Sequence, residues 1–166
     1  MLRSKFFTER TVRTDPTTGI RVIQLTNYPT PSVHFPYDWP SITPDNRYIL
    51  LYSQRWTQRI APWDIFRVDA DGLNLFQLTE DGDQADDTGY GRQHAIMSHD
   101  GKTLYVLWAK VLKAVDIETG RSEPIASLEK YLSDEDVFTQ ICLNGKGDRL
   151  FIPTMESDVA LRLDLA

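Results

Sequence analysis

Ile65-Phe-Arg-Val-Asp-Ala-Asp-Gly-Leu-Asn-Leu-Phe-Gln-Leu-Thr79 decides the fold of this chain. Two apolar runs flank a turn made of aspartate and glycine, which is the sequence pattern of a β-hairpin. The tripeptide Gln-Leu-Thr that ends the stretch also occurs at Gln24–Thr26, again after a turn with aspartate and glycine. The stretch is therefore predicted to be part of a repeating unit rather than an isolated hairpin.

Two further features recur along the chain. Turns rich in aspartate, asparagine and glycine occur at 43–47, 98–102 and 144–148, and each leads into an apolar run. A short run that ends in aspartate closes each unit, at Asp69, Asp116 and Asp164. The units repeat every ~50 residues, which is the period of proteins whose repeats are small β-sheets.

Each unit contains four short segments of strand type, here named A to D. Four strands per repeat at this period predict an all-β fold, a β-propeller fragment of about three four-stranded antiparallel blades plus an N-terminal closing strand. The predicted domains are a closing strand within 12–26, blade 1 at 34–79, blade 2 at 90–126 and an incomplete blade 3 at 136–166. In blade 1 the predicted strands A to D are 39–43, 48–53, 64–69 and 73–78. In blade 2 they are 93–97, 103–108, 111–116 and 122–126. In blade 3 only strands A to C are predicted, at 138–143, 149–154 and 159–165.

The predicted strands do not form a closed ring of blades. The segment Ile20–Thr26 is predicted to be a lone D strand, and blade 3 lacks a D strand. Because a propeller needs about four blades or more to close, the chain is expected to be a fragment of a longer propeller. Two copies that complete each other as a homodimer are the alternative. One helical turn or two is expected at 126–132.

Composition excludes several classes of function. The net charge of −6 argues against a partner that is nucleic acid or an anionic membrane, because both attract clustered lysine and arginine. The single cysteine, Cys142, excludes an intrachain disulfide and is expected to be a small buried residue. The N-terminal segment has no apolar core of a secretory signal, so a cytoplasmic location is expected.

Pro40-Ser-Ile-Thr-Pro-Asp45, Ile65–Asn74 and Gln77–Thr79 together resemble the repeat of TolB-like propellers. A narrower resemblance spans residues 12 to about 152. Its residues are Asp15, Thr18, Gly19, Val22, Leu25, Thr26, His34, Phe35 and Tyr37, then the Gln-Leu-Thr-Glu run 77–80 with the Asp-Gly-Asp run 81–83, and Asp116 to Gly120. In this order they resemble the N-terminal half of oligogalacturonate lyases.

The lyase resemblance implies metal-assisted β-elimination on pectin fragments, with a histidine base and a divalent, manganese-like metal. It also implies an anionic oligosaccharide as the partner. The metal and base histidines of that family lie in later blades, so no catalytic residue and no metal ligand is assigned to this chain. Whether the chain is an enzyme is left open, and a non-catalytic TolB-like scaffold is the alternative.

In a propeller, the central funnel is lined by the first strand of each blade and by the loop that leads into that strand. Polar residues at these positions are therefore the candidates for binding a substrate. His34 and Tyr37 lie on the loop that leads into the first strand of blade 1, and His94 lies where the chain enters the first strand of blade 2. Arg55 and Arg92 are candidates for a uronate carboxylate, which suits a bidentate guanidinium. Alternatives stay open: a structural hydrogen bond for His94 and an inter-blade salt bridge for Arg55. His99, in a hairpin turn, is expected to be solvated.

Overall fold

The structure is a computed structural model that describes residues 8–35, 39–55, 63–80, 94–108, 110–132, 141–154 and 160–165. It divides into two compact units, Met1–Arg92 and Gln93–Ala166, and each is described by itself. Within the described ranges, no helix is long and apolar enough to cross a membrane.

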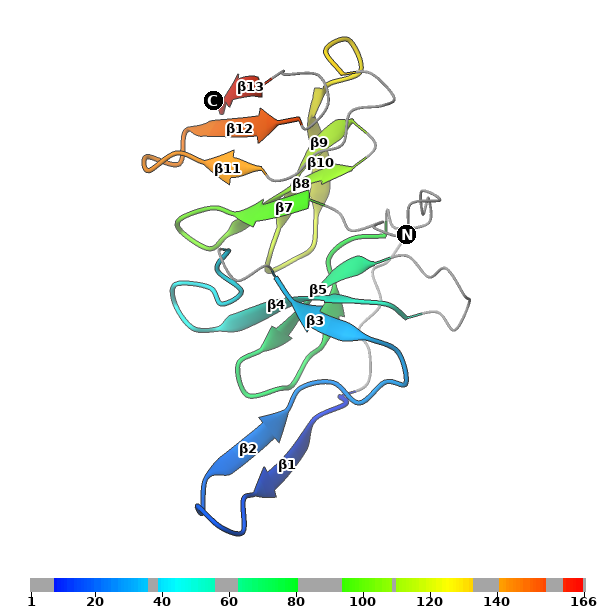
Figure 1. Ribbon diagram of the computed structural model, residues 1–166, viewed down its shortest axis with the longest axis vertical. Coiled ribbons are helices and arrows are strands. Elements are labelled where there is room, and N and C mark those ends of the chain that lie inside the picture. The colour runs from blue at the N-terminus through cyan, green and yellow to red at the C-terminus, as the bar shows by residue number, and fades with distance from the viewer. Residues whose placement is uncertain are drawn as a thin grey trace. The chain divides into compact units, whose positions relative to one another are not determined.

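The first unit contains a hairpin and a four-stranded sheet (Figure 1). The hairpin pairs β1 (Thr11–Thr14) with β2 (Arg21–Gln24) in antiparallel fashion. The sheet has the order β3-β4-β5-β6, with each strand antiparallel to its neighbours. Its strands are β3 (Ser32–His34), β4 (Tyr48–Ser53), β5 (Asp64–Asp69) and β6 (Phe76–Gln77).

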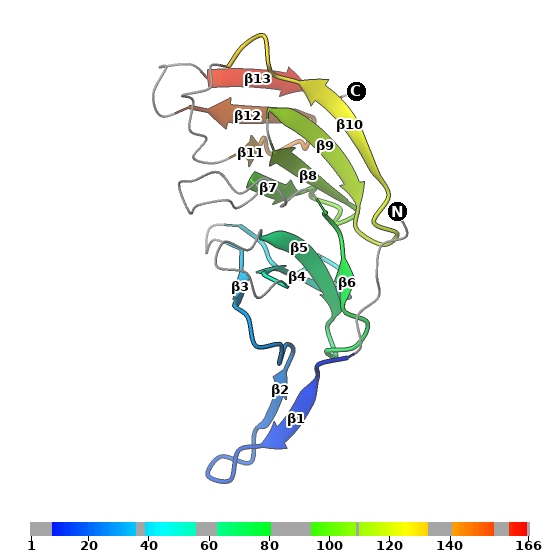
Figure 2. The same cartoon turned by 90° about the vertical axis from the view of Figure 1, so that its right-hand side faces the viewer.

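The second unit contains two antiparallel sheets, which lie face to face in Figure 2. One has the order β7-β8-β9-β10, from β7 (His94–Met97), β8 (Thr103–Trp108), β9 (Val111–Asp116) and β10 (Ser122–Ser127). The other has the order β11-β12-β13, from β11 (Cys142–Leu143), β12 (Arg149–Pro153) and β13 (Ala160–Asp164). The all-β fold of blade-like, four-stranded antiparallel sheets is confirmed, and the three sheets are called blades 1, 2 and 3 below.

The turn between strands A and B has the same hydrogen bonds in blades 1 and 2. In blade 1, the Thr43 hydroxyl donates to Asp45 Oδ1 at 2.6 Å, and the Arg47 N–H donates to the same oxygen. In blade 2, Ser98 and Lys102 make the matching bonds to Asp100. The donated hydrogen bonds, first that of Ser98, lower the pKa of Asp100. The recurring Thr/Ser-x-Asp turn therefore sets the register of the strands that it joins.

The Gln-Leu-Thr tripeptide also has a structural role. Gln77 Nε2 donates to the Thr79 carbonyl at 2.8 Å and to Asp64 Oδ2 at 2.9 Å. The Thr79 hydroxyl accepts the backbone N–H of Ile65 at 2.9 Å. In the N-terminal hairpin, Gln24 Nε2 likewise donates to the Thr26 carbonyl at 2.9 Å. Side chains thus add hydrogen bonds where strand D leaves strand C. β6 is shorter than the predicted 73–78.

Strand A of blade 1 differs from its prediction at 39–43. The main pairing with β4 is made by β3, in which His34 lies opposite Leu51, and Ile42 then makes a single bridge to Ile49. Only Leu50 of β4 lies between these two pairs, and in blade 2 the equivalent position has Ile96 opposite it. Phe35 in this interruption is fully buried and lies against Tyr52, with 4.7 Å between ring centroids.

The N-terminal segment also corrects a prediction, because 12–26 contains two strands and not one lone strand. Leu25 packs against the buried cluster of blade 1, which consists of Leu51, Phe66, Val68 and Leu75. The helical turn expected at 126–132 is not formed, since β10 continues to Ser127 and a hydrogen-bonded turn follows, from the Tyr131 N–H to the Leu128 carbonyl.

Blades 2 and 3 share an apolar core, and along β12 the side chains of this core alternate with side chains that lie outside it. Leu150 and Ile152 are fully buried in it, while Phe151 between them is 40% exposed. Cys142 pairs with Phe151 across the sheet and is also exposed, so the prediction of a buried cysteine is wrong. The reason is the two-residue period of a strand, which puts cross-strand partners on the same face. The buried members are Leu107, Leu112, Leu128, Leu132, Ile141, Leu150 and Ile152.

Two glycines in left-handed turns give a matched test of how the N-terminal segment packs. Gly72 has φ +86°, and a Cβ there would lie 3.1 Å from Arg10 and Ile23 side-chain carbons. Gly19 has φ +73° and open space around it. We expect Gly19→Ala to lower the free energy of unfolding by about 1 kcal/mol from backbone strain alone, and Gly72→Ala by about 2 kcal/mol. Urea unfolding measures both, and equal losses would contradict the close packing at Gly72.

Candidate functional site

His34 is the last residue of β3, so it lies on the first strand of blade 1 and not on the loop before it. The side chain is exposed, and its Nδ1 donates to the carbonyl of Phe35. In a neutral ring this bond leaves the lone pair on Nε2. The position therefore suits a hydrogen bond that Nε2 accepts from a ligand hydroxyl.

His94 is the first residue of β7 and pairs with Leu107. It begins the first strand of blade 2, one position away from the counterpart of His34, which is Ala95. Burial lowers the pKa of His94, so the ring is held neutral near neutral pH. A neutral imidazole both donates and accepts a hydrogen bond, which suits a sugar hydroxyl.

The lowered pKa of His94 predicts a pH dependence. The folded state disfavours protonation, whereas the unfolded chain binds a proton once the pH falls below about 6.5. We therefore expect the free energy of unfolding of the second unit to decrease as the pH falls from about 7.5 to 5. His94→Gln should reduce this decrease, and His99→Gln, which leaves His94 in place, is the control. Urea unfolding across this range that is equally pH-dependent in both variants would contradict the assignment.

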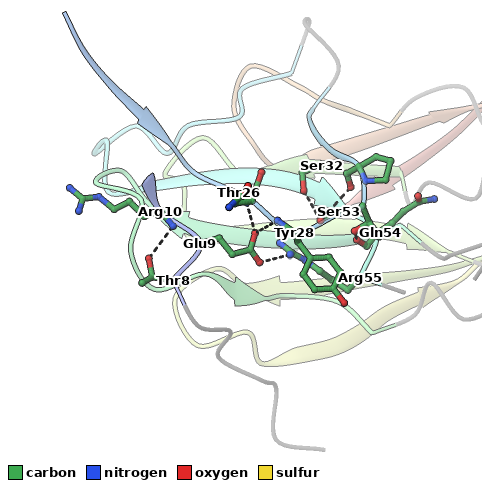
Figure 3. Close-up of polar contacts among 12 residues, drawn as sticks. Thr8, Glu9, Arg10, Thr26, Tyr28, Ser32, Ser53, Gln54 and Arg55 are labelled. Atoms are coloured by element: carbon green, nitrogen blue, oxygen red, sulfur yellow. Dashed lines mark hydrogen bonds and ion pairs between the residues drawn. The ribbon is translucent and has the colours of Figure 1, made fainter. Parts of the chain in front are cut away.

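Arg55 follows β4 and is only 8% exposed. Its Nη1 lies 2.5 Å from Glu9 Oε1, and the guanidinium lies over the ring of Tyr28, 5.1 Å from the centroid (Figure 3). It also lies 5.0 Å from the ring centroid of Phe66. Glu9 Oε2 also accepts the backbone N–H groups of Asn27 and Tyr28, at 2.9 and 3.1 Å. Arg55 therefore ties the N-terminal segment to blade 1, and its predicted contact with a uronate stays a prediction.

The other two candidates, Tyr37 and Arg92, lie outside the described residues. Of the candidate set, the structure thus places His34 and Arg55 in the first unit and His94 in the second. Both histidines lie on the first strands of their blades. His99, expected to be solvated, is exposed, and its Nε2 also lies 2.8 Å from the Asn144 carbonyl in the next hairpin turn.

Sequence reasoning missed a shallow polar cleft at the opposite end of blade 1. The ring of Tyr48 lies between two guanidinium groups, with Arg47 at 4.9 Å and Arg67 at 4.4 Å from its centroid. Arg47 Nη2 also donates to the Tyr48 hydroxyl at 2.8 Å. No sequence pattern indicated it, because the residues that line it come from two stretches, 46–48 and 69–71, that lie apart in the sequence. The cleft is lined by Asn46, Arg47, Tyr48, Asp69, Ala70 and Asp71.

Metal ligands do not gather in the part of the chain that the structure describes. No group of three or more histidine, cysteine, aspartate or glutamate side chains is placed there to hold a metal ion. A catalytic divalent metal needs such a convergent set of nitrogen and oxygen donors. The described residues therefore do not fit a manganese site.

Two solved structures share this arrangement of strands. An oligogalacturonate lyase in complex with manganese matches with a TM-score of 0.65 and 19% identity, over 90% of this chain and 37% of its own. The fold is that of one section of an oligogalacturonate lyase. A second oligogalacturonate lyase, from Vibrio parahaemolyticus, matches with a TM-score of 0.65 and 16% identity, over 92% of this chain and 37% of its own.

The chain thus spans little more than a third of the length of these oligogalacturonate lyases. At the level of fold, the resemblance predicted from the sequence is confirmed. No protein-family model matches the sequence, and no characterised protein matches it by sequence.

Proposed function

We propose that this chain forms a substrate-contacting part of an oligogalacturonate lyase-like propeller and has no lyase activity by itself. The observation that carries the proposal is the match of nine-tenths of the chain to a section of an oligogalacturonate lyase. The Asp-x-x-Thr-Gly turns and the Gln-Leu-Thr segments, which suggested that family from sequence, have matching roles in the structure.

The proposed ligand is an anionic oligosaccharide derived from pectin. His34 and His94 are its proposed contacts, because each lies on the first strand of its blade. These strands line the axis of a propeller, where ligands bind. Tyr37 and Arg92 remain proposed contacts on the sequence argument alone. A cytoplasmic location is likewise proposed from the sequence alone.

The elimination chemistry is not assigned to this chain. The described residues do not fit a manganese site. The resemblance to oligogalacturonate lyases implies that the base and the metal ligands lie in later blades. The proposed contribution of the chain is therefore to bind and orient the sugar, and the reaction needs residues beyond those it supplies.

Titration of the purified chain with trigalacturonate tests the proposal, with nuclear magnetic resonance as the readout. We expect weak binding, with a Kd of about 1 mM, or about −4 kcal/mol, because only part of the site is present. His34→Gln and His94→Gln should each weaken it several-fold. His99→Gln is the matched control and should not.

Two outcomes would contradict the proposal. Release of unsaturated sugar by the purified chain, seen by ultraviolet absorbance, would show that elimination does not need further residues. Binding that is absent, or equally strong for neutral maltotriose, would instead favour a non-catalytic scaffold.

A further inference from the structure

The N-terminal hairpin has the form of the outer half of a blade. Its Asp15–Gly19 turn matches the Asp116–Gly120 turn between strands C and D of blade 2. Asp15 Oδ1 accepts from Thr18 N–H and hydroxyl at 2.7 and 2.8 Å, and Asp116 Oδ1 accepts from Thr119 N–H and hydroxyl at 2.6 and 2.7 Å. The β1–β2 pair therefore corresponds to β9–β10.

An acidic side chain gives a second, independent match, this time with blade 1. There Phe66 lies opposite Gln77, and Asp64, which precedes Phe66 by two residues, bonds to Gln77 and Thr79. In the hairpin Thr11 lies opposite Gln24. Glu9 precedes Thr11 by two residues and bonds to the backbone just after Thr26. β1 thus has the register of a strand C and β2 that of a strand D.

A strand C has a neighbour on both edges in the complete blades. β5 pairs with β4 as well as β6, and β9 pairs with β8 as well as β10. Among the described residues, β1 has only β2 beside it. The hairpin also exposes apolar side chains, with Val12 40%, Ile20 62% and Val22 51% exposed. An unpaired edge beside exposed apolar residues is a template for strand addition.

We propose that the free edge of β1 binds an antiparallel two-stranded ribbon, the A and B strands of a further blade of the same propeller. The chain would then supply two outer strands of that blade rather than the single closing strand expected from sequence. The partner is a further blade because the similar lyases are much longer than this chain. A second copy fits poorly, since its β11–β13 sheet has three strands and the hairpin would make five. The proposal does not depend on lyase activity.

The test uses the chain's own A–B ribbon as the probe. A second copy of His94–Trp108 is joined through a flexible linker of about ten residues to the amino end of the full chain, because β1 begins near that end. We expect amide hydrogen exchange in β1 to become about tenfold slower or more, as for a strand paired on both edges. The extended protein should remain monomeric by light scattering.

The control carries Leu104→Pro and Leu107→Pro in the added copy only. Because proline has no backbone N–H to donate to a neighbouring strand, the added ribbon should no longer pair with β1. Amide exchange in β1 should then be fast again. Unchanged exchange in β1, or protection that appears at β13 instead, would overturn the proposal. A dimer of the unextended chain with β1 already protected would also overturn it, because the occupant would then be a second copy.

Discussion

Replacing Glu9 with alanine is expected to lower the free energy of unfolding of the first unit by about 3 kcal/mol. The substitution removes the carboxylate that faces the buried guanidinium of Arg55. It also removes the acceptor of two backbone N–H groups, those of Asn27 and Tyr28. Loss of one partner from a buried ion pair is costly because the remaining charge stays out of water.

A double-mutant cycle with Arg55→Met separates the ion pair from the other bonds of Glu9. Methionine keeps an apolar chain against Tyr28 and Phe66, so we expect Arg55→Met to cost only about 1–2 kcal/mol. The double variant should be more stable than the sum of the two losses implies, with a coupling of about 1–2 kcal/mol. Urea unfolding provides the values, and Glu80→Ala, at an exposed residue of the same unit, is the control. Strict additivity would contradict the ion pair.

Replacing Phe35 with alanine is expected to cost about 3–5 kcal/mol. The side chain is fully buried, and its ring lies against Tyr52 and 6.4 Å from the ring centroid of Trp39 in an edge arrangement. Its removal would leave a cavity that the strands on either side cannot fill without moving.

The matched control is Phe151→Ala, which makes the same exchange at a side chain 40% exposed and should cost less than about 1 kcal/mol. Hydrogen exchange in β4 should accelerate in Phe35→Ala and not in the control. Similar losses in both variants would mean that Phe35 is not part of the core.

Strands whose apolar run adjoins an Asp- or Gly-containing turn, either before or after it, were predictable from the sequence. β4, β5, β8 and β9 have the predicted bounds, because turn and apolar run fix a strand together. β1 was missed because Thr11–Thr14 contains one apolar residue and is stabilised through Glu9 and β2, not through burial of its own side chains. β3 was missed because a strand interrupted by 35–41 has no continuous pattern to detect.

The candidate site was predictable only in part. The position of His94 on a first strand followed from counting back from the turn at Ser98. The partner of Arg55 could not be predicted, since Glu9 is far from it in sequence and no periodicity connects them. The same limit applies to His99, whose partner Asn144 belongs to the next blade.

The interruption in the first strand of blade 1 has a consequence for how such a protein can change during evolution. Pairing stops at His34, opposite Leu51, and resumes at Ile42, opposite Ile49, so a single residue of β4 separates the two pairs. Insertions or deletions in this segment would leave the hydrogen-bond ladder of the blade unchanged. Ancestral lineages could therefore have altered the length and chemistry of a segment beside His34 while the scaffold stayed constant, which is a route by which one propeller acquires ligands of different size.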